Sequence, residues 1–247
     1  NIWHYFLNLR TLLPRFDIIV AVSENTKRDL VELFNIPAEK IKVIYPGAGS
    51  LAPVRPIDIE ATQKKYQLPA DYFLYVGNLE PRKNVASIIL AFDQFLAEHP
   101  EYNSYGLVLA GSKGWKFHDV FSAWKSAANK DKIHLLGYVS ETEKNCLFLK
   151  ASILIYPSFY EGFGFPVLEA MAAGVPVITS TNSSLPEVAQ DAAILVNPFN
   201  LAEIKAAMLA ILASSRLREQ LRGKAELVKA KFKWKRAAQQ YLKLFIS

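Results

Sequence analysis

The sequence contains a single cysteine, Cys146, and no hydrophobic run long enough to cross a membrane. One cysteine cannot form a disulfide within the chain, which fits a reducing compartment. A membrane-spanning helix needs about 20 consecutive apolar residues, and the opening residues lack the small-residue cleavage site of a signal peptide. These absences favour a cytoplasmic protein. They are also compatible with a protein that binds peripherally to the inner face of the membrane.

Charged residues make up only 21% of the 247 residues, whereas hydrophobic residues make up 51%. This balance is typical of a globular protein and excludes a disordered chain. Lysine and arginine outnumber aspartate and glutamate by 29 to 23, and this excess suits an anionic ligand but is too diffuse to indicate nucleic acid. Its densest part, residues 224–236, indicates either a solvated helix face or a contact with an acidic membrane surface.

Short apolar segments alternate with amphipathic segments along most of the chain. The apolar segments are rich in Val, Ile and Leu without polar alternation, as expected of strands buried on both faces. The predicted strands are 17–22, 40–45, 72–76, 106–110, 132–136, 153–156, 176–179 and 193–196. Their alternation with helices predicts an α/β fold with a doubly wound, Rossmann-like parallel sheet.

A proline-containing segment without a sustained apolar period, residues 51–70, is predicted to be an interdomain linker. Residues 1–50 hold only two helices and two strands, and we expect them to be the end of an incomplete N-terminal domain. That domain would need upstream sequence or a separate subunit to complete its sheet. Residues 71–231 are predicted to form a complete second domain, followed by a C-terminal helix at 232–247.

Ligands of open α/β sheets bind beyond the carboxyl ends of the strands, so the strand-to-helix turns are candidate sites. The turn after the strand at 72–76 contains Arg82 and Lys83, with Asn84 as the predicted helix cap. Two cations at a helix N-terminus oppose the helix dipole, and a bound phosphate would remove this conflict. A solvated basic turn is the alternative interpretation.

The stretch FYEGFGFPVLEAMAAGVPVITS, residues 159–180, holds two glutamates in a sequence otherwise nearly without charge. Glu161 lies in the turn after the strand at 153–156, and Glu169 lies about one turn into a helix that starts near Pro166. Backbone amides of the glycine-rich turn between them can bind oxyanions or sugar hydroxyls. The two carboxylates either flank those amides as hydroxyl acceptors or simply face solvent.

The remaining turns are less specific. Gly111 permits close approach of a flat base or belongs to a simple loop, and Lys113 beside it is predicted to be exposed. Ser140 and Glu143 are predicted to form a capping box, which is a structural feature. His134 lies within a strand and is interpreted as a core residue rather than a catalyst.

The motif E-x7-E from Glu161 to Glu169, in the context EGFGFPVLEAMAAGVPVI, resembles that of the retaining GT-B glycosyltransferases of group 1, or family 4. The segments VAVSENTKRDL, KIKVIYPG, YVGNLEPRKN and KWKRAAQQYLKLF extend the resemblance over essentially the whole chain. They match the end of that family's N-terminal domain and all of its C-terminal domain. The resemblance implies a GT-B fold in which 71–231 binds a nucleotide-sugar and 232–247 packs back toward the N-terminal domain.

The resemblance also implies roles for single residues. Lys83 and, in this EPRKN variant, Arg82 would hold the diphosphate and stabilise its departure. Many relatives have arginine at the position of Asn78, and Arg82 is its expected replacement. Glu169 would bind the ribose hydroxyls, and Glu161 would face the donor sugar. The sugar would also meet the backbone amides of Phe163, Gly164 and Phe165. The base would be bordered by Gly111, Tyr138 and Val139.

The implied activity is transfer of a hexose, with retention, from a nucleotide-diphospho-sugar to a glycan or lipid-linked acceptor in polysaccharide biosynthesis. GDP-mannose is favoured over a UDP-sugar as the donor. No cofactor or metal is expected, because basic residues and helix N-termini neutralise the departing diphosphate and no Asp-x-Asp motif is present. The implied partners are the missing N-terminal domain or a separate subunit.

Other functions remain open at this point. A non-catalytic nucleotide-sugar-binding subunit, which needs a separate acceptor subunit, fits the same residues. Glycoside hydrolysis is less favoured, because the spacing of the glutamates does not fix opposed carboxylates and the basic turn would have no purpose. A GT-B epimerase matches the motif context less well, and a phosphorylase would need a cofactor lysine that the sequence does not indicate.

Overall fold

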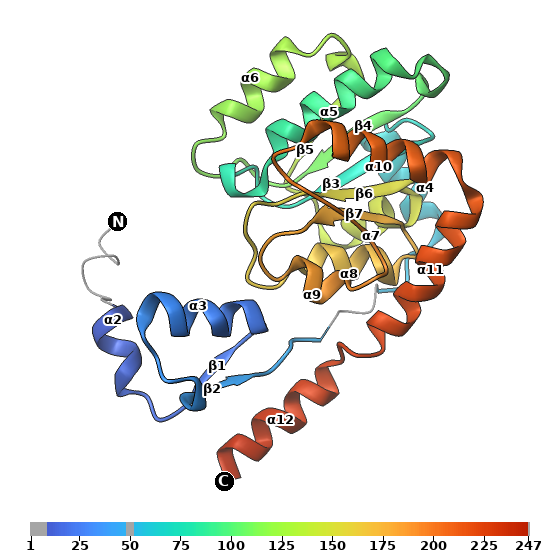
Figure 1. Ribbon diagram of the computed structural model, residues 1–247. Helices are drawn as coiled ribbons and strands as arrows, with labels where there is room; N and C mark the ends of the chain where they lie inside the picture. The colour runs from blue at the N-terminus through green and yellow to red at the C-terminus, as the bar shows by residue number, and fades with distance from the viewer. Residues whose placement is uncertain (1–8, 48–51, 247) are drawn as a thin grey trace. The chain divides into compact units, whose positions relative to one another are not determined.

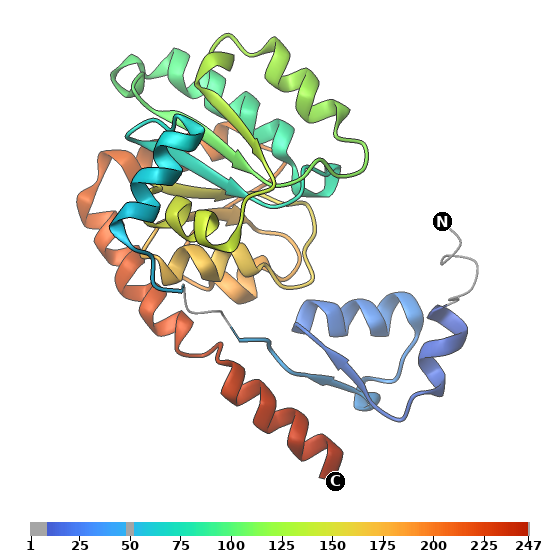
Figure 2. The same cartoon turned by 180° about the vertical axis from the view of Figure 1, so that it is seen from behind.

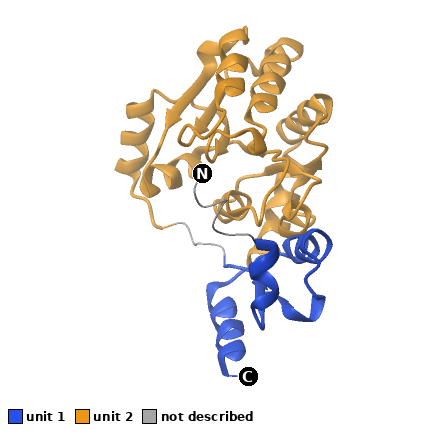
Figure 3. Ribbon diagram, turned by 90° about the vertical axis from the view of Figure 1, so that its left-hand side faces the viewer, with its two compact units in different colours: residues 1–47, 232–247 blue, residues 48–231 orange. Residues whose placement is uncertain are grey.

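The computed structural model describes residues 9–47 and 52–246. Residues 1–8, 48–51 and 247 lie outside the described residues, and with them the junction predicted between residues 50 and 51. The chain divides into two compact units, one of residues 1–47 with 232–247 and the other of residues 48–231 (Figure 3).

The larger unit is built on a six-stranded sheet in the order β5-β4-β3-β6-β7-β8, in which every neighbouring pair is parallel (Figure 1). Its strands are β3 (Tyr72–Val76), β4 (Gly106–Ala110), β5 (Ile133–Gly137), β6 (Ile153–Tyr156), β7 (Val177–Ser180) and β8 (Ile194–Val196). Every residue of β3, β4, β6 and β7 is buried, which is why their sequences show no polar alternation.

Helices cover both faces of this sheet (Figures 1 and 2). The helices are α4 (Pro56–Tyr66), α5 (Val85–Glu98), α6 (His118–Ser126), α7 (Glu141–Lys150), α8 (Phe165–Ala172), α9 (Leu185–Ala189), α10 (Leu201–Ala213) and α11 (Ser215–Lys229). α5, α6 and α10 pack together on one face, and α4, α7 and α8 lie on the other. The predicted α/β fold with a doubly wound parallel sheet is confirmed.

The strand order reverses between β3 and β6. From β3 the chain continues through β4 to β5 on one side, and from β6 it continues through β7 to β8 on the other. In doubly wound sheets, ligands bind at such a switch point, beyond the carboxyl ends of the strands. The turns after β3 and β6 are therefore the elements that position a site.

The structure differs from the predicted linker at 51–70, because α4 occupies much of this segment. Its start is stabilised by an ion pair of 2.8 Å between Arg55 and Asp58, and Pro56 occupies the first turn. Thr62 is the one buried residue of α4, so the helix has no apolar stripe. Hydrophobic periodicity gave no signal for this helix for that reason.

The smaller unit contains β1 (Ile19–Ala21) and β2 (Ile41–Val43), which pair in parallel, and the helices α2 (Leu9–Leu12), α3 (Glu24–Phe34) and α12 (Trp234–Ile246). Ala21, Ile36 and Ile41 form its buried core. The ring of Tyr45 meets the ring of Phe232 edge-on, with centroids 5.5 Å apart. Residues from both ends of the chain thus contribute to this unit.

The predicted capping box at the start of α7 is confirmed. The Ser140 hydroxyl accepts a hydrogen bond from the Glu143 backbone amide, and the Glu143 carboxylate accepts one of 2.8 Å from the Ser140 amide. Glu143 also pairs with Lys65 of α4 at 2.5 Å. Burial opposes ionisation of Glu143, but these partners outweigh it and lower the pKa of Glu143 to about 2.

We expect Glu143→Ala to lower the free energy of unfolding by about 1 kcal/mol at neutral pH, the usual value of a helix cap. Since the pKa of Glu143 is lower in the folded than in the unfolded chain, its stabilisation is complete above about pH 4.3 and declines toward pH 2. Urea unfolding should show the gap between wild type and variant narrowing from pH 6 to pH 3. If the difference in unfolding free energy stayed constant over this pH range, the stabilisation would not come from the ionised carboxylate of Glu143.

Candidate functional site

The turn after β3 forms a short 3-10 helix, Pro81–Lys83, directly before α5. Asn84 follows it in the left-handed conformation, with φ 57°. The predicted side-chain cap by Asn84 is wrong, because a capping residue needs an extended backbone to reach the helix amides. Its amide group instead donates to the carbonyl oxygens of Pro157 at 3.1 Å and Pro198 at 2.7 Å. The basic turn is thereby fixed to the segments after β6 and β8.

Glu161 joins the turns that follow β3 and β6. Its Oε2 accepts a hydrogen bond from Arg82 Nη1 at 2.8 Å, and its Oε1 accepts one from Lys83 Nζ at 2.7 Å. The hydroxyl of Tyr156, at the end of β6, accepts from Lys83 Nζ at 2.7 Å and donates to Glu161 Oε1 at 2.9 Å. The side chains of Lys83 and Glu161 are 12% and 8% exposed. Three predicted site residues therefore meet at the switch point of the sheet.

The cluster holds an ionised carboxylate between two basic side chains. Burial disfavours the charged form of Glu161, but Lys83 and Arg82 outweigh it, and the pKa of Glu161 lies below its usual value. Burial also opposes the charge on Arg82, yet Glu161 raises the pKa of Arg82. Burial and the charge of Glu161 raise the pKa of Tyr156 well above its usual value, so its hydroxyl stays protonated. Arg82 also pairs with Glu80, at a longer distance of 3.6 Å, so two basic groups meet two carboxylates here.

The glycine-rich turn leads from Glu161 into α8. Gly164 has φ 107°, which favours glycine, and a proline lies in the first turn of the helix as predicted. The hydroxyl of Ser184 donates to the carbonyl oxygens of Glu161 and Phe163, both at 2.9 Å. Phe163 is buried, while Phe165 is exposed. The turn therefore has a fixed backbone beside the cluster.

Glu169 belongs to a different ion pair. Its Oε1 lies 2.7 Å from Nζ of Lys144 on α7, and the Glu169 side chain is 20% exposed. Lys144 also pairs with Glu141 at 2.9 Å. Burial opposes the charge on Lys144, but the hydrogen bonds of the two carboxylates outweigh it and raise its pKa. Of the two motif glutamates, Glu161 is thus buried and Glu169 is partly exposed, and they pair with different cations.

The other predicted residues occupy turns at the same edge of the sheet. The backbone carbonyl of Asn78 accepts a hydrogen bond of 2.9 Å from the Tyr75 hydroxyl, which fixes the turn after β3. Tyr138 is 79% exposed and Val139 is half-buried, directly after the last residue of β5. Asn78 therefore lies in the same turn as Arg82 and Lys83, whereas Tyr138 and Val139 follow β5, two strands away from β3.

Gly111 lies at the end of β4, where two backbones approach closely. A Cβ atom at this position would lie 1.9 Å from the carbonyl oxygen of Gly77, and φ is 151°. The Gly111 amide donates to the Gly137 carbonyl at 2.8 Å. The ends of β3, β4 and β5 therefore meet at this glycine.

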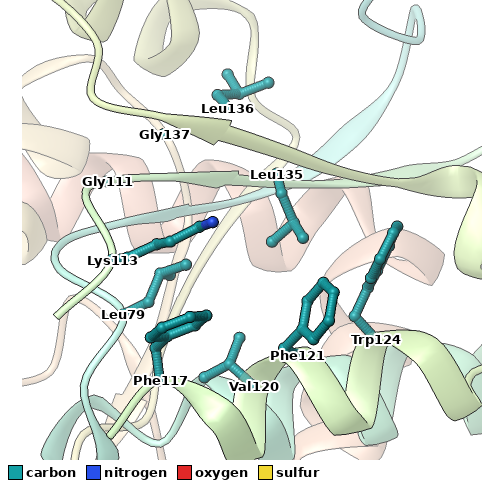
Figure 4. A pocket seen from close by; sticks show the side chains of 10 residues that line it. All are labelled: Leu79, Gly111, Lys113, Phe117, Val120, Phe121, Trp124, Leu135, Leu136 and Gly137. Atoms are coloured by element: carbon teal, nitrogen blue, oxygen red, sulfur yellow. The ribbon is translucent and has the colours of Figure 1, made fainter. Parts of the chain in front are cut away.

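A cavity of about 460 Å³ lies beside Gly111 (Figure 4). It is lined by the turns after β3 and β4, by α6 and by the end of β5. The walls are mostly apolar, with aromatic rings on one side and an aliphatic side on the other. Among the side chains of the lining are Leu79, Lys113, Phe117, Phe121, Trp124 and Leu135. Lys113 is exposed as predicted and also lines this cavity.

We expect Gly111→Ala to lower the free energy of unfolding by about 1–3 kcal/mol, because the methyl group meets Gly77 and the backbone becomes strained. Gly223→Ala is the matched control. Gly223 lies within α11 with no atom near its Cβ position, so alanine should stabilise that helix by up to about 1 kcal/mol. Urea unfolding measures the free energy of unfolding of both variants. If Gly111→Ala stabilised the protein as Gly223→Ala is expected to do, the close approach of the Gly111 and Gly77 backbones would be contradicted.

Other features named from the sequence have no part in the cluster. His134 is half-buried in β5, and burial lowers its pKa. Within residues 9–47 and 52–246, no group of three or more His, Cys, Asp or Glu side chains is arranged to hold a metal ion. In the same ranges, no helix combines the length and apolarity that crossing a membrane requires.

Two residues that hold the site together, Tyr156 and Lys144, are not among the candidates that the sequence indicates. Tyr156 is the last residue of the predicted strand at 153–156. Tyr156 places a hydroxyl at the last position of a buried strand, directly before the turn that contains Glu161, and this position could have indicated a site residue. The pairing of Lys144 with Glu169 depends on the packing of two helices and has no local signal.

Two protein-family models match the sequence. The model described as "Glycosyl transferases group 1" covers residues 58–228, and the model described as "Glycosyltransferase Family 4" covers residues 1–48. The first match spans well over half of the chain. The protein therefore belongs to the group 1 glycosyltransferases, as the E-x7-E motif and its context predict.

Curated relatives include mannosyltransferases of O-antigen assembly. O-antigen chain mannosyltransferase B of Escherichia coli is 33% identical over 240 residues, which cover 96% of this chain and 62% of that protein. Serotype-specific mannosyltransferase WbdA of Escherichia coli is 28% identical, over 96% of this chain and 30% of that protein. O-antigen chain mannosyltransferase RfbU of Salmonella typhimurium is 32% identical, over 77% of this chain and 49% of that protein. The chain thus spans less than two thirds of each.

Solved structures share the fold at low sequence identity. Anabaena Alr3699/HepE, in complex with UDP and glucose, has a TM-score of 0.84 and 19% identity, over 96% of this chain and 65% of that chain. A glycosyltransferase from Rickettsia africae has a TM-score of 0.82 and 19% identity, over 99% of this chain and 66% of that chain. The expected GT-B type of fold is confirmed.

Proposed function

We propose that this chain carries the donor site of a retaining glycosyltransferase, which moves a hexose from a nucleotide-diphospho-sugar to a glycan or lipid-linked acceptor. The observation that carries the proposal is the cluster of Arg82, Lys83 and Glu161 at the switch point of the sheet. The relatives are named as mannosyltransferases, which favours GDP-mannose over a UDP-sugar as the donor.

Arg82 and Lys83 bind the diphosphate and stabilise it as the leaving group. The Lys83 ammonium has three N–H groups, of which two point to Tyr156 and Glu161, so one is left for a phosphate oxygen. Arg82 is 38% exposed and has further N–H groups for a second oxygen. Fixed cations aimed at the developing charge supply this stabilisation without a metal.

Glu161 orients its neighbours and does not act as a nucleophile. Its carboxylate already accepts hydrogen bonds from Arg82, Lys83 and Tyr156, which hold it in place and lower its nucleophilicity while leaving about one acceptor site for a sugar hydroxyl. Together with the amides of Phe163, Gly164 and Phe165, it faces the hydroxyls of the donor sugar.

Glu169 and the cavity hold the nucleoside. Glu169 lies within α8, where its partly exposed carboxylate accepts from the ribose hydroxyls. The base enters the apolar cavity beside Gly111, whose lining ends at Gly137, directly before Tyr138 and Val139. A cavity of about 460 Å³ falls within the usual range for a small-molecule site.

The acceptor site belongs to sequence beyond this chain or to a separate subunit, since the chain spans 62% of the length of the Escherichia coli relative. A non-catalytic nucleotide-sugar-binding subunit is the second candidate, favoured by the small size of the sheet that β1 and β2 form. The protein acts in the cytoplasm at the inner face of the membrane, where its basic C-terminal segment meets acidic lipids.

The role of Glu169 is tested by calorimetry with GDP and with 2′,3′-dideoxy-GDP. Glu169→Ala should weaken GDP binding about tenfold or more and leave binding of the dideoxy analogue within about twofold. Glu226→Ala is the control, because it removes a carboxylate that is 67% exposed on α11. Equal loss for both ligands would mean that Glu169 acts through the fold and not on the ribose.

A further inference from the structure

The Glu169 carboxylate lies at the end of a side chain with several rotatable bonds, which a bound ligand would have to order. A side chain that is already held in one rotamer loses less freedom on binding, and the ligand then binds more tightly. Glu169 is 20% exposed, and its Oε1 accepts a hydrogen bond of 2.7 Å from Lys144 Nζ on the neighbouring helix α7. Lys144 is therefore in a position to fix this carboxylate before a ligand arrives.

The position of Lys144 is itself fixed by the start of α7. The Lys144 amide donates to the Ser140 carbonyl at 2.8 Å, in the helical turn that the capping box of Ser140 and Glu143 closes. The Lys144 ammonium also pairs with Glu141, three residues earlier, at 2.9 Å. The Lys144 side chain is 17% exposed, whereas that of Glu141 is 72% exposed. The lysine is thus held at its backbone and at its tip while it reaches from α7 to α8.

The contact with Lys144 leaves acceptor sites on Glu169. A carboxylate has about four acceptor sites on its two oxygens, and the Lys144 ammonium occupies one of them, on Oε1. Acceptor sites therefore remain on both oxygens, and two neighbouring hydroxyl groups of one ligand need such an arrangement. The ammonium group also keeps the charge of Glu169 apart from that of Glu141, because it pairs with both carboxylates.

We propose that Lys144 is a positioning residue of the donor site, which holds the Glu169 carboxylate in the orientation that accepts from the two ribose hydroxyls of the nucleotide. This inference rests on the proposed function, because it takes Glu169 to bind the ribose. Without the ammonium group, Glu169 is free to turn and faces the uncompensated charge of Glu141. The loss should therefore appear with ligands that carry ribose hydroxyls and be absent with ligands that lack them.

Calorimetry with GDP and 2′,3′-dideoxy-GDP tests this role, because the two ligands share the base and the diphosphate and differ only in the ribose hydroxyls. Lys144→Met keeps the approximate length of the side chain and removes its charge. The variant should bind GDP about three- to tenfold more weakly than the wild type, the loss expected when binding has to order one more side chain. Its affinity for the dideoxy analogue should stay within about twofold of the wild-type value.

Two further variants separate positioning from direct contact and from a general loss of stability. If Lys144 acts through Glu169, the double variant Lys144→Met, Glu169→Ala should bind GDP within about twofold of Glu169→Ala alone. Lys205→Met is the matched control. The Lys205 side chain is 15% exposed and pairs with Glu98 at 2.5 Å, but it lies on α10, on the other face of the sheet. This variant removes a similar ion pair and should change neither affinity.

Each other outcome overturns the inference in a recognisable way. Equal weakening of both ligands by Lys144→Met would mean that Lys144 acts through the fold. A further loss of GDP affinity in the double variant would mean that Lys144 contacts the nucleotide itself. Unchanged or tighter GDP binding in Lys144→Met would exclude the positioning role, while a strong effect of Glu169→Ala alone would leave the ribose site standing. If Glu169→Ala binds GDP as the wild type does, that part of the proposed function fails and the inference fails with it.

Discussion

Lys83→Ala should weaken the binding of GDP by about tenfold to hundredfold and leave the binding of guanosine nearly unchanged. A hydrogen bond to a charged group contributes about 1.5–3 kcal/mol, and only the diphosphate offers such a partner to the Lys83 ammonium. The effect is large because Lys83 is only 12% exposed and is oriented by Tyr156 and Glu161. Calorimetry with the two ligands measures both affinities.

Lys65→Ala serves as the control for this variant. It removes the same charge from a side chain that is 59% exposed and pairs with Glu143 away from the cluster. We expect it to leave GDP binding unchanged. Equal weakening of GDP and guanosine by Lys83→Ala would contradict a phosphate role for this lysine.

Glu161→Gln should lower the free energy of unfolding by about 2–3 kcal/mol at neutral pH. Removing one member of a buried ion pair usually costs about 3–5 kcal/mol. The expected cost is smaller here, because the Arg82 side chain is 38% exposed and solvent stabilises its charge when the carboxylate is lost. Because the pKa of Glu161 is lowered in the folded chain, its stabilisation is complete above about pH 4.3 and declines as the pH falls through the folded pKa. Urea unfolding should therefore show a smaller gap to wild type below pH 4.

The same variant links stability to anion binding. Without the Glu161 carboxylate, Arg82 and Lys83 lose their shared countercharge, so pyrophosphate should raise the melting temperature of Glu161→Gln more than that of wild type. Glu226→Gln, at an exposed helix position, should change stability by less than about 1 kcal/mol. A variant as stable as wild type, with no response to pyrophosphate, would contradict the role of Glu161 in the cluster.

Much of the fold follows from local sequence. The predicted bounds of the buried strands β3, β4 and β6 match the structure residue for residue. Strands of a parallel sheet are buried on both faces, so each appears in the sequence as a continuous apolar run between turn residues. Helix α4 was not predicted, because its stabilisation comes from an end cap and from packing on α7, with Thr62 as its one buried residue.

The sequence indicates residues that the structure brings together, but not the contacts between them. The sequence indicated Arg82, Lys83 and Glu161 as candidates, yet it assigned the cations to a phosphate and the carboxylate to a sugar. Their mutual ion pairs depend on β3 and β6 being neighbours at the switch point, which local patterns do not reveal. The left-handed backbone of Asn84 is another tertiary effect, since its amide reaches two loops that are distant in sequence.

The most direct test of the donor site is a calorimetric titration of the 247-residue chain with GDP-mannose in buffer containing EDTA. We expect saturable binding of one nucleotide-sugar per chain, which Lys83→Ala weakens strongly and Lys65→Ala does not. GDP, UDP-glucose and UDP complete the series and identify the preferred donor. If none of these ligands binds, or if binding is the same in Lys83→Ala, the cluster at the switch point is not a donor site.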